Sequence, residues 1–292
     1  MSMTINLKGG LGNQLFQLFS LMGISKKNNY KYLIDKKYES DRKTYWDTIL
    51  ASLPNCDNSL ESISKNNNSE IFIVNEQRFS QYSDFELDNK IYPNVLLNGY
   101  FQSFFYFEQI RDFVFDTLIT KQDKNIMETV NSIYNEIKNK YTNKKMVFIH
   151  RRTGDFNDEK HNGYFPILSI DDYYKKAISQ FNQDDCVFII FSNEPVPTIE
   201  EFNFLKNKEF VIQEDYIEFL LMTKMDAAVL SNSTFSIWAA YLMDYYRNKK
   251  IICPKYWFRE WDIHRLDFFE NHWIFIENHD VYKNVSFDPC RK

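Results

Sequence analysis

The feature that most constrains the fold is a pattern of short apolar runs that alternate with segments of helical spacing, and this pattern occurs twice. The first series opens with an expected strand at residues 4–7 and a glycine-rich turn at residues 9–12. A helix follows, and its apolar face holds Leu15, Leu18, Phe19 and Met22. The second series begins at residue 146. Strands that alternate with helices form parallel sheets covered by helices on both faces. The sequence therefore predicts an α/β fold of two doubly wound parallel-sheet lobes with a cleft between them.

The two series also set the expected domain organisation. A polar helix is expected at residues 126–137, and the division near residue 141 gives lobes of residues 1–141 and 142–292. In the second series we expect strands at residues 146–150, 186–191, 210–212, 227–230, 250–253 and 273–276. Helices are expected at residues 170–181, 199–205, 216–224 and 233–247. Residues 38–94 show no regular pattern and no motif that identifies a ligand.

Charge and cysteine usage exclude several classes of protein. The formal net charge is −5 and the basic residues are scattered, so the basic stripe that a nucleic-acid partner requires is missing. The four cysteines lie far apart in the sequence, which argues against a disulfide framework or a zinc site. No apolar run reaches the length of a membrane span, and the N-terminus does not resemble a signal peptide. We therefore expect a cytoplasmic protein without a membrane span or a nucleic-acid partner.

The turn after the first strand is the first candidate site, with the sequence Gly9-Gly10-Leu11-Gly12-Asn13-Gln14. A dinucleotide-binding fingerprint needs a third glycine where Leu15 stands, so that pattern is not met. A tight glycine turn still lets the backbone approach a ligand closely. Two interpretations stay open. Either the turn contacts a ligand through Gly10, Gly12, Asn13 and Gln14, or these residues only form the turn and the start of the helix.

The second candidate segment is His150-Arg151-Arg152-Thr153-Gly154-Asp155, directly after an expected buried strand. Open parallel sheets bind their ligands beyond the carboxyl ends of the strands. The planar fork of an arginine suits a diphosphate, because it contacts two oxygens at once. His150 and Arg152 share one face of an extended chain, whereas Arg151 lies opposite and is expected at the surface. Asp155 would hold Arg152 in place; the alternative interpretation is a surface salt bridge.

Two further segments follow expected strands. The stretch Ser231-Asn232-Ser233-Thr234-Phe235-Ser236 precedes a helix. Hydroxyls and backbone N–H groups at a helix N-terminus form an anion site. A helix cap explains one hydroxyl here, but not four hydroxyls with an asparagine. The segment Phe191-Ser192-Asn193-Glu194, which Pro195 follows, stands at another strand end and is a weaker signal, because most such loops are only turns.

The sequence does not predict a metal site. It contains no Asp-x-Asp, and adjacent aspartates such as Asp171-Asp172 would point to opposite faces of a strand. A hard divalent cation that holds a diphosphate is therefore not expected. The positive charge that a departing diphosphate needs would come from Arg152 and from the helix that starts near Ser233.

Together these segments resemble the α-1,2-fucosyltransferases, the family 11 type of glycosyltransferase. The resemblance runs from Gly9 to about Trp257 and rests on six motifs in the same order. The motifs are GGLGNQLFQ from Gly9, NGYFQSFFYF from Asn98, the His-x-Arg segment at His150, DDYYKKAI from Asp171, SNSTFSIWAAYL from Ser231, and the Pro254 to Trp257 ending. Each motif alone is modest, whereas their shared order is specific.

The resemblance implies a GT-B-like fold, with GDP-fucose in the C-terminal lobe and a glycan acceptor on the side of the N-terminal lobe. It implies inversion at the fucose carbon, with no metal or other cofactor required. It assigns Arg152 to the β-phosphate, His150 to the surroundings of the guanine and Glu218 to the guanine edge. A loop would wrap the phosphates with Asn232, Ser233, Thr234, Phe235 and Ser236. The expected donor site is completed by Ser192, Asn193, Gly10, Gly12, Asn13 and Gln14.

The expected reaction is a single displacement, in which an acceptor hydroxyl, O-2 of a galactoside, attacks the fucose carbon and GDP leaves. Arg152 would stabilise the departing diphosphate, and Asp155 is the candidate general base unless it only orients Arg152. Thr153 stands where the family has a second arginine, and Phe156 stands where it has a tyrosine. Two alternatives stay open. One is a transferase for another GDP-sugar or another hydroxyl. The other, motivated by Thr153, is a non-catalytic nucleotide-sugar-binding or glycan-binding protein.

Overall fold

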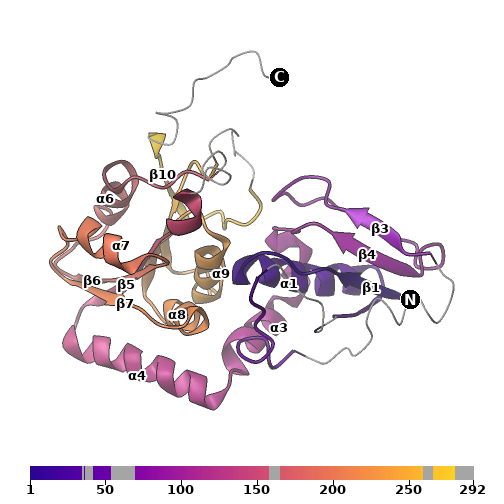
Figure 1. Ribbon diagram of the computed structural model, residues 1–292, viewed down its shortest axis with the longest axis horizontal. Helices are drawn as coiled ribbons and strands as arrows, with labels where there is room; N and C mark the ends of the chain where they lie inside the picture. Colours follow the sequence, from indigo (N-terminus) through magenta and orange to yellow (C-terminus); the bar gives the residue numbers. More distant parts are fainter. Residues whose placement is uncertain (35, 37–41, 54–69, 158–164, 259–265, 280–292) are drawn as a thin grey trace, which may run out of the picture. The chain divides into compact units, whose positions relative to one another are not determined.

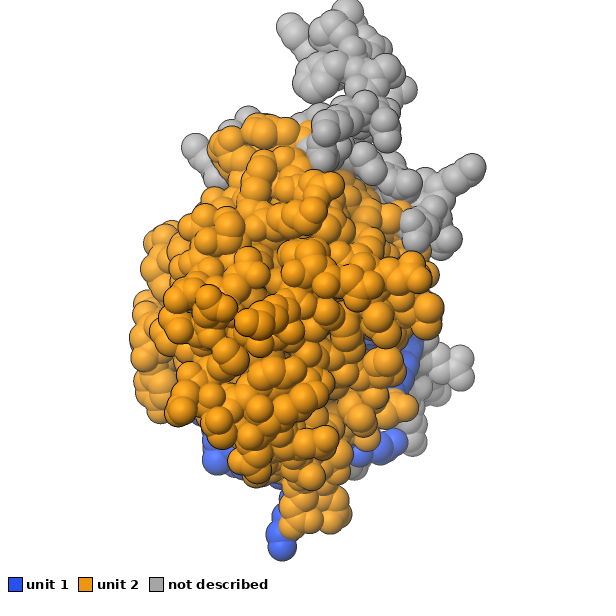
Figure 2. All heavy atoms as spheres, turned by 90° about the vertical axis from the view of Figure 1, so that its left-hand side faces the viewer, with its two compact units in different colours: residues 1–124, 265–270 blue, residues 125–264, 271–292 orange. Residues whose placement is uncertain are grey.

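The computed structural model describes the chain except residues 35, 37–41, 54–69, 158–164, 259–265 and 280–292 (Figure 1). The chain divides into two compact units, which Figure 2 distinguishes by colour. The first unit comprises Met1–Lys124 with Arg265–Glu270, and the second comprises Asn125–His264 with Asn271–Lys292. The division therefore falls before the helix α4 (Lys124–Lys140) rather than after residue 141.

Helix α4 belongs to the second unit because its C-terminal end is tied to a strand of that unit. The hydroxyl of Tyr141, which follows the helix, donates to the carbonyl of Lys208 at 3.2 Å. Lys140 also forms an ion pair with Glu209. The sequence predicted the helix, but the partners that assign it to a unit lie far along the chain.

The first unit contains a four-stranded parallel sheet with the strand order β2-β1-β4-β3. The strands are β1 (Ser2–Ile5), β2 (Lys31–Tyr32), β3 (Phe72–Asn75) and β4 (Asn94–Asn98). Strand β3 lies inside the stretch that showed no regular pattern, and its side chains are mostly exposed, so it lacks the apolar signal of a buried strand. Short helical turns follow β4, namely η1 (Phe104–Tyr106), η2 (Glu108–Ile110), α3 (Arg111–Phe115) and η3 (Asp116–Thr120).

Helix α1 (Leu11–Lys27) is the central helix of the first unit and is buried along most of its length. The predicted apolar face is confirmed, since Leu15, Leu18 and Phe19 have no exposed surface. Gly23 lets this helix approach the backbone of η1 closely. A Cβ atom at Gly23 would lie 2.1 Å from the carbonyl oxygen of Tyr106.

The second unit contains a six-stranded parallel sheet with the order β10-β9-β8-β5-β6-β7. The strands are β5 (Lys145–Arg151), β6 (Cys186–Ser192), β7 (Lys208–Val211), β8 (Ala227–Val229), β9 (Lys250–Pro254) and β10 (Ile274–Ile276). All six coincide with predicted strands to within a few residues. The central strands β5 and β6 are buried almost throughout, as expected for a parallel sheet covered on both faces.

Helices connect these strands and lie around the sheet (Figure 1). They include α7 (Pro195–Glu201), α8 (Asp215–Met222) and α9 (Thr234–Met243). Helix α7 begins earlier than predicted because Pro195 occupies its first turn, where a missing N–H has no consequence. The expected helix at residues 170–181 is a π-helical turn, η5 (Ile170–Tyr174), that continues into α6 (Lys175–Ile178). In the part of the chain that is described, no helix is long and apolar enough to cross a bilayer.

The strand order of the second sheet places a topological switch point between β5 and β8. From β5 the chain builds β6 and β7 on one side, then crosses over to build β8, β9 and β10 on the other. Ligands of open α/β sheets bind in the crevice where the strand order reverses, at the carboxyl ends of the strands. The loops that follow β5 and β8 are the segments that the sequence singled out.

Candidate functional site

The end of β5 meets the segment that leads from β8 into α9 through two contacts of His150. The Nδ1 atom of His150 and the hydroxyl of Ser231 are hydrogen bonded at 2.9 Å. The imidazole also packs against the ring of Phe235, with the ring centroids 5.5 Å apart. The structure thus brings together the second and third candidate segments, which lie 81 residues apart at this bond.

His150 is a neutral, buried residue of this site. Burial, together with the nearby positive charge of Arg152, lowers the pKa of His150 to about 3. Its carbonyl oxygen accepts a hydrogen bond of 2.8 Å from the buried hydroxyl of Tyr174. Because the imidazole stays uncharged at neutral pH, it supplies packing and one hydrogen bond rather than a positive charge for an anion.

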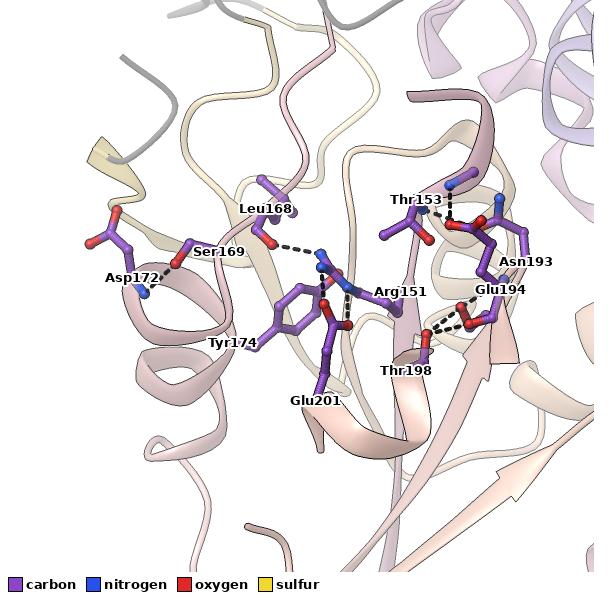
Figure 3. Close-up of polar contacts among 12 residues, drawn as sticks. Arg151, Thr153, Leu168, Ser169, Asp172, Tyr174, Asn193, Glu194, Thr198 and Glu201 are labelled. Carbon is purple, nitrogen blue, oxygen red and sulfur yellow. Dashed lines mark hydrogen bonds and ion pairs between the residues drawn. The ribbon is translucent and has the colours of Figure 1, made fainter. Parts of the chain in front are cut away.

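Arg151 is buried, so the expectation that it lies at the surface was wrong (Figure 3). Its Nε and Nη2 atoms each donate to one carboxylate oxygen of Glu201 at 2.8 Å. Its Nη1 atom donates to the carbonyl of Leu168 at 2.6 Å, and its guanidinium lies 5.3 Å from the ring centroid of Tyr174. A buried arginine needs such partners because an unpaired buried charge is very unfavourable. Glu201 was missed because its position in the sequence carries no motif.

Arg152 lies in a different environment from its neighbour. It is only partly buried, and its guanidinium lies 5.6 Å from the ring centroid of Phe156. The two arginines thus differ in burial, since Arg151 is enclosed by the protein and Arg152 is partly exposed. Arg152 therefore follows β5 at the switch point and is only partly buried.

The backbone that follows Arg152 is held by side chains from the end of β6 (Figure 3). Asn193 accepts the N–H of Thr153 at 3.0 Å, and Glu194 accepts the N–H of Gly154 at 2.6 Å. Gly154 has a φ of +59°, and a Cβ there would lie 2.2 Å from the Asn193 amide nitrogen. Ser192 is hydrogen bonded to Thr198 at 2.8 Å. The pair Ser192-Asn193 thus lies at the same edge of the sheet as Arg152, as the sequence predicted, and Asn193 contacts the loop after Arg152.

The loop after β8 leads into α9, and several of its side chains bind the protein itself. The amide nitrogen of buried Asn232 donates to the carbonyls of Pro166 and Trp257, at 2.8 and 3.2 Å. The Ser236 hydroxyl donates to the carbonyl of Ser233 at 3.1 Å. Asn232 and Ser236 therefore shape this loop. Partly buried residues remain toward the surface at the start of α9, namely Ser233, Thr234 and Phe235.

Glu218 lies on α8, and this helix packs against the start of α9. The rings of Phe219 and Phe235 are 5.5 Å apart, which connects α8 to the ring that contacts His150. A carboxylate oxygen of Glu218 accepts the N–H of Gln213 at 3.0 Å. Burial raises the pKa of Glu218 to about 7. A carboxylate held partly out of water in this way has a strong need for hydrogen-bond donors.

The glycine-rich turn belongs to the first unit and follows β1, whose neighbour β4 marks the switch point of that sheet. Gly9 has a φ of +79°, so the turn requires a glycine. The buried Gln14 side chain donates to the carbonyls of Gly9 and Lys43, both at 2.8 Å. Asn13 accepts from the amide of Gln102 at 2.9 Å. Gly12 is buried in the first turn of α1, whereas Gly10 has open space around it. The side chains therefore build the turn, and its accessible part is the backbone at Gly10.

Two expectations concern the remaining chemistry of the site. Asp155 lies in the short helical turn η4 (Gly154–Asn157), but its side chain is outside the described part of the structure. Among the residues that the structure describes, no group of three or more His, Cys, Asp or Glu side chains could hold a metal ion.

Residues 1–277 match the model of the family described as glycosyl transferase family 11. The chain belongs to glycosyl transferase family 11. This glycosyltransferase is 23% identical over 289 residues to the O-antigen biosynthesis glycosyltransferase WbnK of Escherichia coli, covering 86% of this chain and 93% of the relative. The predicted family is thus confirmed.

The GT-B-like fold of this family 11 glycosyltransferase recurs in solved structures of low sequence identity. The structure of NodZ α-1,6-fucosyltransferase co-crystallised with GDP has a TM-score of 0.50 and 13% identity, covering 82% of this chain and 92% of that one. The apo form of POFUT1 has a TM-score of 0.50 and 11% identity, covering 86% and 97%. At such identities the likeness establishes the fold, two parallel sheets with helices.

Proposed function

We propose that this glycosyltransferase moves L-fucose from GDP-fucose to a glycan acceptor, at O-2 of a galactoside, with inversion and without a metal ion. The observation that carries the proposal is the partly exposed Arg152 at the switch point between β5 and β8, two residues after His150, which packs against Phe235 at the start of α9. Membership of family 11 supports it. So does the GT-B-like fold shared with a fucosyltransferase crystallised with GDP.

The diphosphate is proposed to bind between Arg152 and the loop before α9. The first turn of a helix presents N–H groups that the helix itself does not satisfy, and its dipole favours an anion. Ser233, Thr234 and Phe235 lie at this turn. During transfer, negative charge builds on the β-phosphate as the bond to fucose breaks. Preorganised donors at such a point each contribute about 3–4 kcal/mol of transition-state stabilisation. No metal is needed if these groups neutralise the leaving diphosphate.

The guanine is proposed to bind at Glu218. An ionised carboxylate accepts two hydrogen bonds, and the N1–H and amino group of guanine supply two adjacent donors. Adenine offers no such pair, and a site built for hydrogen bonding rejects a ligand that leaves its groups unpaired. His150, which contacts Phe235, provides a neutral wall beside this position.

The acceptor hydroxyl must lose its proton as it attacks. Asp155 is the proposed general base by its position after Arg152; in the alternative role it orients Arg152. The glycine-rich turn, with its accessible backbone at Gly10 and with Gly12, Asn13 and Gln14 shaping it, is a further proposed ligand-binding segment. The remainder of the first unit is proposed to bind the acceptor.

The experiment that tests the proposal is GDP release from GDP-fucose in the presence of a mixed set of galactosides. The product linkage is determined by NMR, and GDP-mannose serves as the competing donor. We expect release only with GDP-fucose and an α-linkage at O-2. Faster release with GDP-mannose, or another linkage, assigns a different donor or hydroxyl. Binding of GDP-fucose without transfer to any acceptor would indicate the non-catalytic protein that Thr153 motivated.

A further inference from the structure

Helix α7 and the turn before it hold the chain on both sides of Arg152. Arg151 is bound by Glu201, which is the last residue of α7. Thr153 and Gly154 are bound by Asn193 and Glu194, which form the turn before the same helix. Figure 3 shows both sets of contacts in one view. Arg152 is therefore the single residue that lies between the two anchored positions.

The contact on the N-terminal side of Arg152 is a two-pronged ion pair. Only 4% of the Arg151 side chain is exposed, against 31% for Glu201. The third donor group of Arg151 binds the carbonyl of Leu168, so its orientation is defined by several contacts. A planar fork bound at two points has little freedom to rotate. Strand β5 therefore ends in a fixed direction at Arg151.

The contact on the C-terminal side of Arg152 acts on backbone groups. Two consecutive N–H groups, of Thr153 and Gly154, donate to side chains of the β6–α7 turn at 3.0 and 2.6 Å. Gly154 adopts a φ of +59° in a place where a Cβ would collide with Asn193. The backbone after Arg152 thus follows the surface of the turn closely, in a conformation that favours glycine.

The turn that makes these contacts is itself well connected. The N–H of Glu194 donates to the Ser192 hydroxyl at 3.0 Å, and that hydroxyl is 2.8 Å from the buried hydroxyl of Thr198. Thr198 also donates to the carbonyl of Glu194 at 2.7 Å. Each side chain in this chain of bonds therefore fixes the next, from β6 through the turn into α7.

We propose that the segment from Asn193 to Glu201 positions Arg152 for the diphosphate, with Glu194 and Glu201 as positioning residues. The inference rests on the proposed function, because it takes Arg152 as the residue that contacts the β-phosphate. A hydrogen-bond donor stabilises a transition state well only if it is held in place before the reaction. A distant mutation that misplaces such a group by 1 Å can lower the rate about 10²-fold. Fixing the residues on either side of Arg152 limits the backbone freedom that a ligand would otherwise have to restrict.

The test compares the affinities of GDP and GMP by calorimetry in four proteins: wild type, Glu194→Ala, Glu194→Gln and Glu200→Ala. GMP lacks the β-phosphate, so it does not report on Arg152. We expect Glu194→Ala to weaken GDP binding about tenfold, in the range found for residues that orient a ligand-binding group, and to change GMP binding less than twofold. Glu194→Gln retains an acceptor for Gly154 and should keep most of the affinity. Glu200→Ala is the matched control, because Glu200 is an exposed carboxylate of the same helix.

A double-mutant cycle separates positioning from general stability. In the Arg152→Ala background, Glu194→Ala should have no further effect on GDP affinity, since coupled residues are not additive. Equal losses for GDP and GMP, full additivity with Arg152→Ala, or unchanged GDP affinity in folded Glu194→Ala would overturn the inference. If Glu194→Ala does not fold, Thr198→Val replaces it, because this substitution removes the hydroxyl that supports the turn. It should likewise weaken GDP binding and leave GMP binding nearly unchanged. A wild-type protein that binds GDP and GMP equally contradicts the role of Arg152 itself, and so the proposed function.

Discussion

Three consecutive residues at the end of β5 differ in their surroundings, and their chemistry follows from this. His150 is buried and neutral, Arg151 is buried and paired with Glu201, and Arg152 is partly exposed. The sequence predicted that a ligand site begins here, because polar groups at the end of a buried strand are unfavourable unless they have partners. It could not show that the first arginine has a buried partner, since Glu201 lies 50 residues away.

Substituting each arginine by lysine should separate catalysis from stability. Lysine keeps the charge but loses the fork, so Arg152→Lys should lower kcat at least ~10²-fold, as for loss of one preorganised donor. Arg151→Lys should lower the free energy of unfolding by about 1–3 kcal/mol, because buried hydrogen bonds of a charged group are lost. Its kcat should fall less than that of Arg152→Lys, because Arg151 acts on the diphosphate only by fixing the chain before Arg152. Steady-state kinetics and urea unfolding measure the two effects; the reverse ranking of kcat would exchange the roles of the arginines.

The raised pKa of Glu218, about 7, predicts a pH dependence of GDP binding. Only the carboxylate accepts two hydrogen bonds from guanine, so binding requires loss of the proton. Affinity should therefore fall as the pH drops through 7 and be about tenfold weaker at pH 6 than at pH 8. Titration calorimetry of Glu218→Gln provides the comparison, since ionisation of the phosphate affects both proteins equally. The same slope in both proteins would show that Glu218 does not bind the base.

The lowered pKa of His150 predicts a loss of stability in acid. Its pKa is about 3 in the folded protein and about 6.5 when unfolded, so the unfolded chain binds more protons between these values. Stability therefore rises with pH in this window and falls on acidification. Between pH 7 and pH 5 the residue should account for a loss of about 2 kcal/mol. Urea unfolding should show this loss in wild type and a smaller one in His150→Asn; equal losses would mean that His150 titrates normally.

At the scale of elements, the sequence predicted most of the second sheet because its strands are apolar and bounded by turns. It missed β3, whose exposed side chains give no such pattern, and it placed the start of α7 several residues late. The glycine-rich turn was predicted as a turn, and the structure adds that Gln14 closes it by binding two carbonyls. Such bonds depend on residues brought near only by folding.

The packing of α1 predicts contrasting effects for two glycines. A Cβ at Gly23 would lie 2.1 Å from a backbone oxygen of Tyr106, which cannot rotate away. Gly23→Ala should therefore lower the free energy of unfolding by about 3 kcal/mol. This loss outweighs the roughly 1 kcal/mol by which alanine is favoured over glycine inside a helix. A Cβ at Gly10 would contact nothing, so Gly10→Ala should lower the free energy of unfolding by about 1 kcal/mol or less. Chemical denaturation compares the two variants, and equal effects would contradict the close approach of α1 to η1.

At the scale of the whole molecule, the two-unit α/β organisation and the family were predicted from the sequence. The division between the units was placed after α4 instead of before it, because the bonds from Lys140 and Tyr141 to β7 are long-range. No pattern in a single sequence reports such pairings.

The proposed chemistry predicts that the whole enzyme works without a divalent cation. Arg152 and the start of α9 are proposed to neutralise the departing diphosphate, which leaves no essential role for Mg²⁺ or Mn²⁺. Transfer from GDP-fucose should continue at an unchanged rate in excess EDTA. Loss of activity that returns on addition of either metal would require a different account of the leaving group.

The switch-point arrangement also affects when the site can form during synthesis. The bond between His150 and Ser231 joins positions 81 residues apart. The entropy of closing such a loop must be overcome before the contact stabilises anything. A nascent chain that has emerged only through β7 therefore contains Arg152 and the segment from Asn193 to Glu201, but it lacks Ser231 and the start of α9. On the proposed function, nucleotide recognition requires translation past α9, so a chain truncated before that helix should bind no donor.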